Sequence, residues 1–280
     1  MMNAVLLLGP LLAPLMSPSA PVHAAGAAAA TVQTTGEFDH SHAGLTAVYD
    51  AVLKEGLVDY AALRRSPEAL DSYLAALSAT TPSIHASWSR NERFAFWINA
   101  YNAFTLQLIR DKGPVKSIKD LGGWLSTPWE KKFIPMPAFD PEKKNKKITL
   151  DEIEHEFLRP VFKDYRLHAA INCASMGCPP LRAQAYTASG LDEELADQVA
   201  VWLGDPTRNR VTPAGGKIRV SKIFDWFKKD FGKKDERVIR WIADHVGDES
   251  LAATLRAQAK DLDVSYLSYD WSINAQPGKR

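Results

Sequence analysis

The segment between Arg93 and Arg110 places the strongest constraint on how this 280-residue chain folds. On a helical projection of about 100° per residue, its apolar side chains fill one broad face and much of the remainder. These residues are Phe94, Phe96, Trp97, Ile98, Tyr101, Phe104, Leu106, Leu108 and Ile109. A helix that is apolar almost all round has to be buried, so the other elements must pack around it.

This helix also carries two polar residues, Asn99 and Asn102, within its apolar surface. A buried amide without hydrogen-bond partners costs about 1–3 kcal/mol, so both side chains need partners from other elements. The simpler interpretation is that they tie the helix to a neighbouring loop. The alternative is that they orient a catalytic group or donate to an oxyanion.

Capping signals mark where several helices begin and end. Ser89 and Glu92 form a capping box before the apolar helix, and Gly113 followed by Pro114 ends it. Thr149 and Glu152 form a second capping box. Further helices are predicted at 43–56, 66–79, 191–205, 221–232, 235–246 and 249–259.

Strands are predicted to be few and short. The run 167–172 reads as a buried strand, 209–220 as a hairpin turned at Gly215 and Gly216, and 262–274 as a strand. Residues 114–147 are predicted to be irregular, with a solvated lysine run at 143–147. The element order predicts one helix-rich α+β domain over 39–276, built around a small, mostly antiparallel sheet.

Polar residues interrupt two more apolar helix faces. Glu154 projects into the middle of a face made by Leu150, Ile153, Phe157 and Leu158, with His155 at its border, and Asp230 lies within the apolar stripe of 221–232. A carboxylate in such a place must be paired or have a shifted pKa. Glu154 is therefore either half of a buried ion pair or, with His155, an acid–base pair. We expect these polar residues and the two asparagines to converge on one site.

The stretch HAAINCASMGCPPLR, residues 168–182, holds both cysteines of the chain. One interpretation is a Cys173–Cys178 disulfide, closed by a turn at Met176 and Gly177. A second is a metal loop, but the usual zinc-ligand spacings are missing, so we expect neither a metal nor a cofactor. The third is that Cys173, which follows the predicted strand, is a nucleophile.

A nucleophilic cysteine requires a base and a group that orients the base. His155 comes from a separate helix and is the predicted base, with Glu154 or Asn99 as the orienting group. His168 would lie on the same predicted strand as Cys173, about 16 Å away and on the opposite face, which makes it a poor partner. His168, Cys178, Asn172 and Asp230 are secondary candidates for the site.

The N-terminal residues predict export. Residues 1–24 contain an apolar run followed by small residues, which is typical of a signal peptide, and 25–38 read as a flexible leader. The run is too short to span a bilayer, so we expect a periplasmic or secreted protein without a stable membrane span. The net charge of +1 argues against nucleic-acid binding, which leaves an unknown small molecule or peptide as the ligand.

Six motifs resemble the domain of unknown function 547 family over about residues 56–274. They are GLVDYAAL (56–63), AFWINAYNAFT (95–105), LDEIEHEFLRP (150–160), HAAINCASMGCPPLR (168–182), SKIFDWFKKDF (221–231) and YDWSIN (269–274). The chain follows the bacterial form of the pattern, with both cysteines. The plant form keeps the Glu-His pair and a cysteine like Cys173 but often lacks a counterpart of Cys178, which implies that a disulfide does not define the family. The family has no settled activity.

The leading hypothesis is an exported thiol-dependent hydrolase or acyl transferase acting on an amide or ester, with chemistry like that of papain or a transglutaminase. Because His155 precedes Cys173, this hypothesis implies a permuted arrangement of the papain kind. The alternative is a non-catalytic binding or scaffold domain with a structural Cys173–Cys178 disulfide. A redox role for the pair is a third option, although the cysteine spacing is not that of the usual oxidoreductases.

Overall fold

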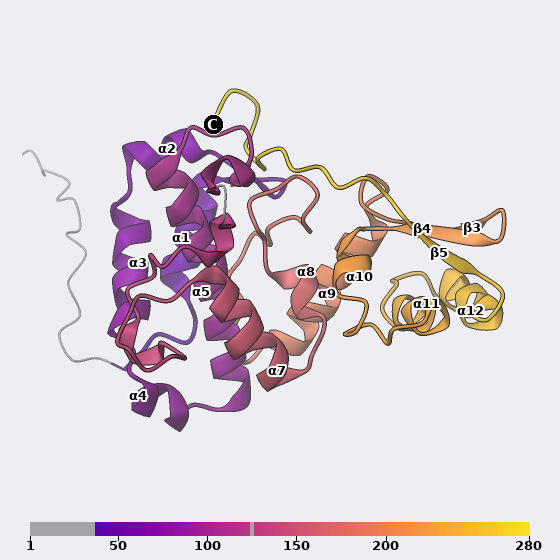
Figure 1. The fold of residues 1–280 in the computed structure, drawn as a ribbon, viewed down its shortest axis with the longest axis horizontal. Coiled ribbons are helices and arrows are strands. Elements are labelled where there is room, and N and C mark those ends of the chain that lie inside the picture. The colour runs from indigo at the N-terminus through magenta and orange to yellow at the C-terminus, as the bar shows by residue number, and fades with distance from the viewer. Residues whose placement is uncertain (1–36, 124–125) are drawn as a thin grey trace, which may run out of the picture. The chain divides into compact units, whose positions relative to one another are not determined.

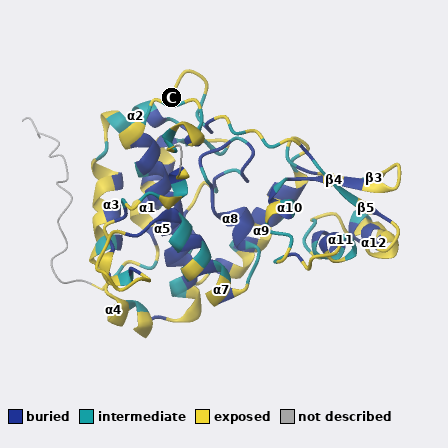
Figure 2. Cartoon of the chain, viewed as in Figure 1, coloured by how far each residue is buried: buried dark blue, intermediate teal, exposed yellow. Residues whose placement is uncertain are grey.

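The helix predicted from the apolar segment is α5 (Arg90–Lys112), in a computed structural model that describes residues 37–123 and 126–280. The Ser89–Glu92 capping box is present, and the helix ends before Gly113, as predicted. Every residue from Phe94 to Leu106 is buried, and α5 is dark blue along most of its length in Figure 2. The all-round apolar pattern therefore marks the helix around which the first core forms.

Between residue 37 and α5, the structure has four helices and a short hairpin. The helices are α1 (Ala43–Val52), α2 (Tyr60–Arg65), α3 (Glu68–Ala79) and α4 (Pro82–Ser87). The predicted helix 43–56 stops early because Glu55 and Gly56 take positive φ and turn β1 (Leu53–Lys54) onto β2 (Leu57–Val58). Only glycine suits position 56, since a Cβ there would lie 2.6 Å from Pro180 Cβ.

A second core lies on the side of the Phe38–Arg280 unit opposite to α1 and α3 (Figure 1). Its elements are α9 (Leu191–Gly204), β3 (Arg210–Ala214), β4 (Lys217–Val220), α10 (Ile223–Trp226), α11 (Asp235–Ala243), α12 (Glu249–Gln258) and β5 (Asp263–Tyr266). The sheet order is β3-β4-β5, with β3 antiparallel and β5 parallel to β4. The helices between β4 and β5 supply the crossover that a parallel pair requires. A helix-rich α+β chain with small sheets is thus confirmed.

The predicted strand at 167–172 is wrong. Leu167–Ala170 form the short helix α8, and Ile171, which follows it, is extended. A short buried apolar run fits a buried strand and a buried helix equally well, so its pattern could not separate them. The predicted elements at 262–274 and 221–232 are also shorter than expected, because regular structure is confined to β5 and α10.

The helix that begins at the Thr149–Glu152 capping box changes its winding after one turn. It consists of α6 (Leu150–Glu152), a π-helical turn (Ile153–Leu158) and α7 (Arg159–Phe162). The Arg159 N–H donates to the Glu154 carbonyl, five residues back. Pro160 has no N–H, and its ring would clash with a carbonyl four residues earlier in a regular helix, so the wider turn accommodates it. Such turns occur frequently at functional sites.

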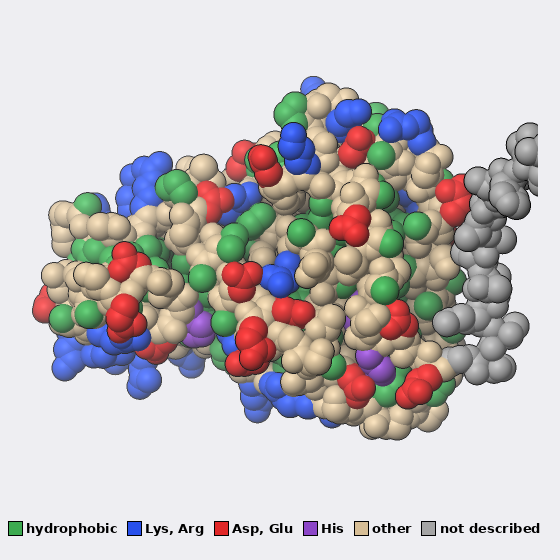
Figure 3. All heavy atoms as spheres, turned by 180° about the vertical axis from the view of Figure 1, so that it is seen from behind, with side chains coloured by type: hydrophobic (Ala, Val, Ile, Leu, Met, Phe, Trp, Pro, Cys, Tyr) green, Lys and Arg blue, Asp and Glu red, His purple; other side chains and the backbone are tan. Residues whose placement is uncertain are grey.

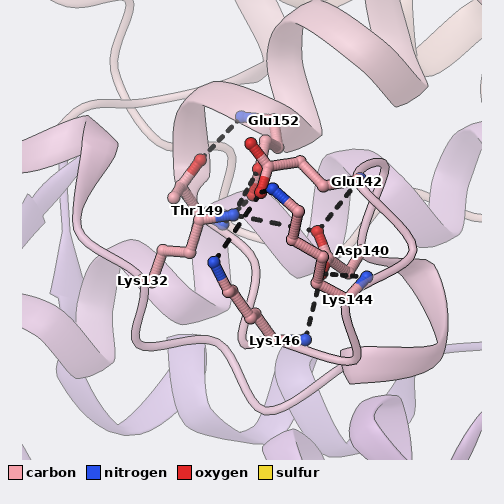
Figure 4. A network of polar contacts seen from close by, with 7 residues as sticks. All are labelled: Lys132, Asp140, Glu142, Lys144, Lys146, Thr149 and Glu152. Atoms are coloured by element: carbon pink, nitrogen blue, oxygen red, sulfur yellow. Dashed lines mark hydrogen bonds and ion pairs between the residues drawn. The ribbon is translucent and has the colours of Figure 1, made fainter.

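The lysine run at 143–147 is exposed, as predicted, and a single carboxylate orders the loop that carries it. Asp140 accepts hydrogen bonds from the backbone N–H groups of Glu142, Lys144 and Lys146 at 3.0–3.1 Å (Figure 4). These bonds, led by that from Lys146, lower the pKa of Asp140. Lys132 lies beside the same carboxylate and also binds Glu152 at 2.8 Å.

The surface carries both signs of charge. Acidic and basic side chains are interspersed over the face shown in Figure 3. Among the described residues, no helix combines the length and the apolar composition needed to cross a membrane. The predicted signal peptide (1–24) and all but the end of the leader (25–38) lie outside the described residues.

We predict that Asp140→Ala loosens the 140–147 loop without unfolding the domain, because three backbone N–H groups lose their acceptor. Limited trypsin digestion at native temperature should cut first within residues 143–147, faster than in the wild type. Glu142→Ala is the matched control, since its exposed carboxylate binds only neighbouring lysines. Equal cleavage rates in the two variants would contradict this account of the loop.

Candidate functional site

The two cysteines face each other across a tight loop. Cys173 Sγ lies 2.7 Å from Cys178 Sγ, and both residues are free thiols. This distance exceeds the bond of about 2.05 Å in a disulfide, so no Cys173–Cys178 bond is formed. Ala174 follows Cys173 with a φ of 60°, in the left-handed region that L-residues rarely adopt. The loop is therefore held in a conformation that its surroundings must maintain.

A chain of buried amides holds this loop on α5. Asn102 accepts from the Asn172 N–H at 2.9 Å and donates to the Ala170 carbonyl at 2.9 Å. The Asn172 side chain accepts from the Ala174 N–H at 2.7 Å and donates to the Pro179 carbonyl at 2.7 Å. Both ends of the loop and its left-handed residue are thus fixed by two asparagines.

Residues 269–276 cover the other side of the loop. Ser175 pairs with Ile273 in an antiparallel bridge, and the Gly177 N–H donates to the Asp270 carbonyl at 2.8 Å. The Tyr269 hydroxyl therefore lies 3.0 Å from Cys178 Sγ and 3.4 Å from Cys173 Sγ. Glycine is required at position 177 because a Cβ there would lie 2.9 Å from the Tyr269 ring.

Hydrogen bonds divide the two thiols into an acidic and a neutral one. The bond from Cys178, followed by bonds from Tyr269 and Ser175, outweighs burial and lowers the pKa of Cys173 to about 7. Burial raises the pKa of Cys178 well above its ordinary value, and the neighbouring Cys173 raises it further. Cys173 is consequently the thiolate of the pair, and the thiolate is the reactive form of cysteine.

The thiols and their own segment, 168–178, line a cavity of about 300 Å³ together with residues from five other segments. The lining residues are Tyr101, Thr127, Trp129, Glu130, Asp151, Glu154, His155, His168, Ile171, Cys173, Cys178, Ile223, Trp226, Phe227, Tyr269 and Trp271. Of the residues that the sequence singles out, Cys173, Cys178, Glu154, His155 and His168 meet here. Asn99 and Asn102 do not line the cavity.

Glu154 places a carboxyl group in this cavity. Its side chain is buried, and among the described residues it has neither a hydrogen bond nor an ion pair. The interpretation of Glu154 as half of a buried ion pair is therefore wrong. Burial raises the pKa of Glu154 to about 8, against the lowering effect of the Arg159 charge, and the nearby Cys173 raises it further. Near neutral pH this carboxyl is largely protonated.

The two histidines of the cavity have different partners. His155 Nδ1 lies 2.7 Å from an Arg159 nitrogen, and its Nε2 lies 3.4 Å from Asp151 Oδ1. No hydrogen bond joins its imidazole to Glu154, the predicted orienting group, within the described part of the chain. Burial is the largest cause that lowers the pKa of His155. Both ring nitrogens of His155 thus contact residues of its own helical segment, Arg159 and Asp151.

His168 carries the oriented imidazole. Its Nε2 lies 2.9 Å from Asp230 Oδ2, and its ring stacks on Phe227 at 4.2 Å between centroids. Burial lowers the pKa of His168 despite this carboxylate. Burial alone would raise the pKa of Asp230, but bonds from His168 and Arg159 lower it to about 2. The predicted separation of about 16 Å between His168 and Cys173 is wrong as a reason to exclude His168. It assumed an extended strand, whereas Leu167–Ala170 form the helix α8.

The two asparagines of α5 follow the simpler interpretation. The Asn99 side chain donates to the Tyr186 carbonyl at 2.7 Å and accepts from the Tyr186 N–H at 3.0 Å. Asn102 acts in the same way on the chain that leads into the cysteine loop. Both residues tie the central helix to loops, and Asn102 supports the site through Asn172.

Sequence reasoning missed the aromatic wall of the cavity. Trp226 is the last residue of α10, and Phe227 follows it. Tyr269 and Trp271 come from the segment after β5. These residues lie far from the cysteines in the chain, so no local spacing connects them. The available signal was their concentration in SKIFDWFKKDF and YDWSIN, two motifs with more aromatic residues than a short amphipathic element needs.

The site offers no arrangement for a metal within the described residues, since no group of three or more His, Cys, Asp or Glu side chains is placed to hold an ion. The cavity itself brings together the Cys173 thiol of lowered pKa, the Glu154 carboxyl of raised pKa and the imidazoles of His155 and His168.

Comparison with known families gives one match. Residues 85–203 match a family model described as "Protein of unknown function, DUF547". Searches of curated proteins and of solved structures gave no match. The matched segment contains both cysteines, Glu154, His155 and His168, whereas Asp230 and the aromatic residues of 226–227 and 269–271 lie beyond it.

We predict that Asn172→Ala lowers the free energy of unfolding by roughly 2–4 kcal/mol, because several buried polar groups lose their partner. It should also slow alkylation of Cys173 at pH 7, since the loop that presents the thiol is released. Asn209→Ala is the matched control: this buried asparagine also binds two backbone groups, but it ties Trp202 to Ser221 in the second core. Chemical denaturation and alkylation kinetics measure both effects, and equal alkylation rates in the two variants would refute the role of Asn172.

Proposed function

Residues 85–203 of this chain belong to the DUF547 family, described only as being of unknown function, and we propose that the protein is a thiol-dependent hydrolase or acyl transferase acting on an amide or ester. One observation carries the proposal. Cys173 shares a cavity with Glu154, a buried carboxyl that has no partner of its own in the described structure. A nucleophile and an uncommitted proton carrier in one cavity are what acyl transfer requires.

Cys173 is the nucleophile in this proposal. Its sulfur is in hydrogen-bond contact with Cys178 Sγ and with the hydroxyls of Tyr269 and Ser175, and these contacts favour the thiolate. In the first step the thiolate attacks the carbonyl carbon and a new C–S bond forms. The bond to the leaving amine or alkoxide then breaks, and the leaving group requires a proton.

Glu154 supplies this proton. Its raised pKa keeps the carboxyl protonated near neutral pH, as a general acid requires. After it donates, Glu154 is a carboxylate and Cys173 is an acyl thioester. In the second step Glu154 takes a proton from water or an acceptor amine, which attacks the thioester carbonyl, and Cys173 leaves as the thiolate. The cycle then returns both groups to their starting forms.

The histidines have supporting places in this scheme. His155, predicted as the base, contacts Arg159 and Asp151 instead of Glu154. His168 is fixed by Asp230, as the imidazole of a Cys-His-Asp site would be. We assign His168 the second position in proton transfer, behind Glu154. The proposal retains the permuted arrangement relative to papain, since Glu154 and His168 both precede Cys173 in the chain.

A second candidate function is a non-catalytic binding or scaffold domain with a Cys173–Cys178 disulfide. The separation of 2.7 Å between the sulfurs favours it, because oxidation would require little movement. The state of the thiols in protein purified from its native compartment separates the two proposals. A free Cys173 that alkylates well below pH 8 supports the enzyme, and a stable disulfide supports the scaffold.

We also propose that the protein is exported from the cytoplasm. The pattern of residues 1–24 is typical of a signal peptide and supports a periplasmic or secreted location. Substrates would then be amides or esters that occur outside the cytoplasm.

We predict a bell-shaped pH dependence of kcat/KM with its maximum between about pH 7 and 8. Activity should rise as Cys173 ionises near pH 7 and fall as Glu154 loses its proton near pH 8. Glu154→Gln should lower kcat/KM by about 10²–10⁴-fold and remove the alkaline decline, since a general acid is lost. The measurement is hydrolysis of a panel of activated esters and peptide amides.

The control is Glu156→Gln, the same chemical change in the same helical segment at an exposed position outside the cavity. It should leave the pH profile unchanged. Full activity in Cys173→Ala would end the proposal, and full activity in Glu154→Gln would remove the carboxyl from the mechanism.

We predict that Glu154→Gln also stabilises the fold at alkaline pH. The pKa of Glu154 is raised from 4.5 to about 8, so between these values the unfolded chain has released a proton that the folded chain keeps. The wild type therefore loses stability as the pH rises through this window, by on the order of a few kcal/mol. The amide of the Glu154→Gln variant does not titrate, so urea denaturation at pH 5 and pH 8 should show a smaller loss in the variant. An equal loss in both proteins would contradict the raised pKa.

A further inference from the structure

We propose that the cavity beside Cys173 binds a positively charged alkylammonium group, which identifies the substrate or acyl acceptor as a primary amine. This inference deepens the proposed function by naming the chemical class that the same site recognises. Its binding component does not depend on catalysis and can be tested without turnover.

The first observation is the sign of the charged groups around the cavity. Three carboxyl residues line it, Glu130, Asp151 and Glu154. No Lys or Arg is among the described residues that line it. Glu130 and Asp151 are at least partly exposed, so they can attract a cation from solvent, whereas Glu154 lies inside. The carboxylates of Glu130 and Asp151 would repel an anionic ligand.

The second observation is that the Glu154 carboxyl lacks a polar partner among the described residues. Its side chain is about nine-tenths buried and faces the cavity, yet neither a hydrogen bond nor an ion pair reaches it from the described residues. A buried carboxyl without partners is unfavourable, and an ammonium group would provide charged donors. The protein itself places no cation within ion-pair distance of this carboxyl, as far as the described residues extend, which leaves that position to a ligand.

The third observation is the aromatic wall. Trp271 stacks on Trp226 at 5.4 Å between centroids and lies 4.5 Å from the Tyr269 ring. Lys119 Nζ already lies 3.8 Å from the Trp271 ring centroid, so a cation is accommodated on this wall. Faces of tryptophan attract ammonium groups through the ring quadrupole. Trp226 is 46 % exposed and offers a further aromatic surface at the cavity.

An amine also fits the chemistry of the second step. A neutral amine attacks the acyl thioester, and it forms when the bound ammonium gives its proton to the Glu154 carboxylate left by the first step. The new C–N bond then replaces the C–S bond, and Cys173 leaves as the thiolate. The second proton of the attacking nitrogen is released to solvent as the amide forms, so atoms and charges balance without any additional reactant.

The test is equilibrium binding to the full chain carrying Cys173→Ser, which cannot form the thioester. Three ligands of equal length are compared by titration calorimetry: n-butylammonium, 1-butanol and butyrate. We expect n-butylammonium to bind at least about tenfold more tightly than 1-butanol, and butyrate to bind most weakly. Equal affinity for the ammonium and the alcohol, or a preference for butyrate, would overturn the proposal.

Variants then locate the site. Asp151→Asn and Trp226→Leu, each combined with Cys173→Ser, should weaken n-butylammonium binding by about fivefold or more. Glu142→Gln is the matched control, because this exposed carboxylate lies in the 140–147 loop and does not line the cavity. A loss of binding equal to that of the control variant would place the ammonium elsewhere and refute the proposal.

The result is separable from the proposed function. Ammonium binding in the Cys173→Ser protein, together with a wild type that turns over no ester or amide, would retain the cation site and reject the hydrolase. Turnover by the wild type without any preference for ammonium over the neutral alcohol would do the reverse.

Discussion

The two hydrogen bonds that Asn102 makes with residues 170 and 172 are the connection on which the site depends. They join the most buried helix of the chain to the loop that carries both thiols. Because α5 is enclosed along its length, the amide cannot exchange these partners for water, and each bond is retained only while the loop keeps its position. Asn172, which this attachment holds, in turn binds the N–H of the left-handed Ala174, so the contacts that orient Cys173 lead back to the core helix.

The cavity combines groups that a protein interior ordinarily avoids. A carboxyl without partners among the described residues and a partly exposed thiol lie among aromatic rings, and the fold tolerates them because the surrounding elements are independently stable. Arg159 and Asp230, by contrast, form an ion pair at 2.8 Å. They neutralise each other and orient His168, so the buried acid left unpaired in this cavity, within the described structure, is Glu154. This buried acid lies in the same cavity as Cys173, where its burial can alter reactivity.

Local signals predicted much of the fold, and the site was predicted only in part. Helix α5 and its capping box, the 149–152 capping box and the β3–β4 hairpin follow from periodicity and turn residues within each segment. The nature of residues 167–172 could not be predicted, because a four-residue helix has too few positions to show a period. Tyr269 and Asp230 meet the site through tertiary packing alone, so only their unusual setting in their own motifs could point to them.

The segment that carries Tyr269 has a consequence for how the chain matures. Tyr269 lies 91 residues after Cys178, although the two side chains touch. At an elongation rate of about 5–20 residues per second, the ribosome needs roughly 5–20 s to make that intervening stretch. During this interval both sulfurs lack the Tyr269 hydroxyl that contacts them in the folded protein. The pair of thiols is therefore synthesised well before the residue that completes its hydrogen bonds.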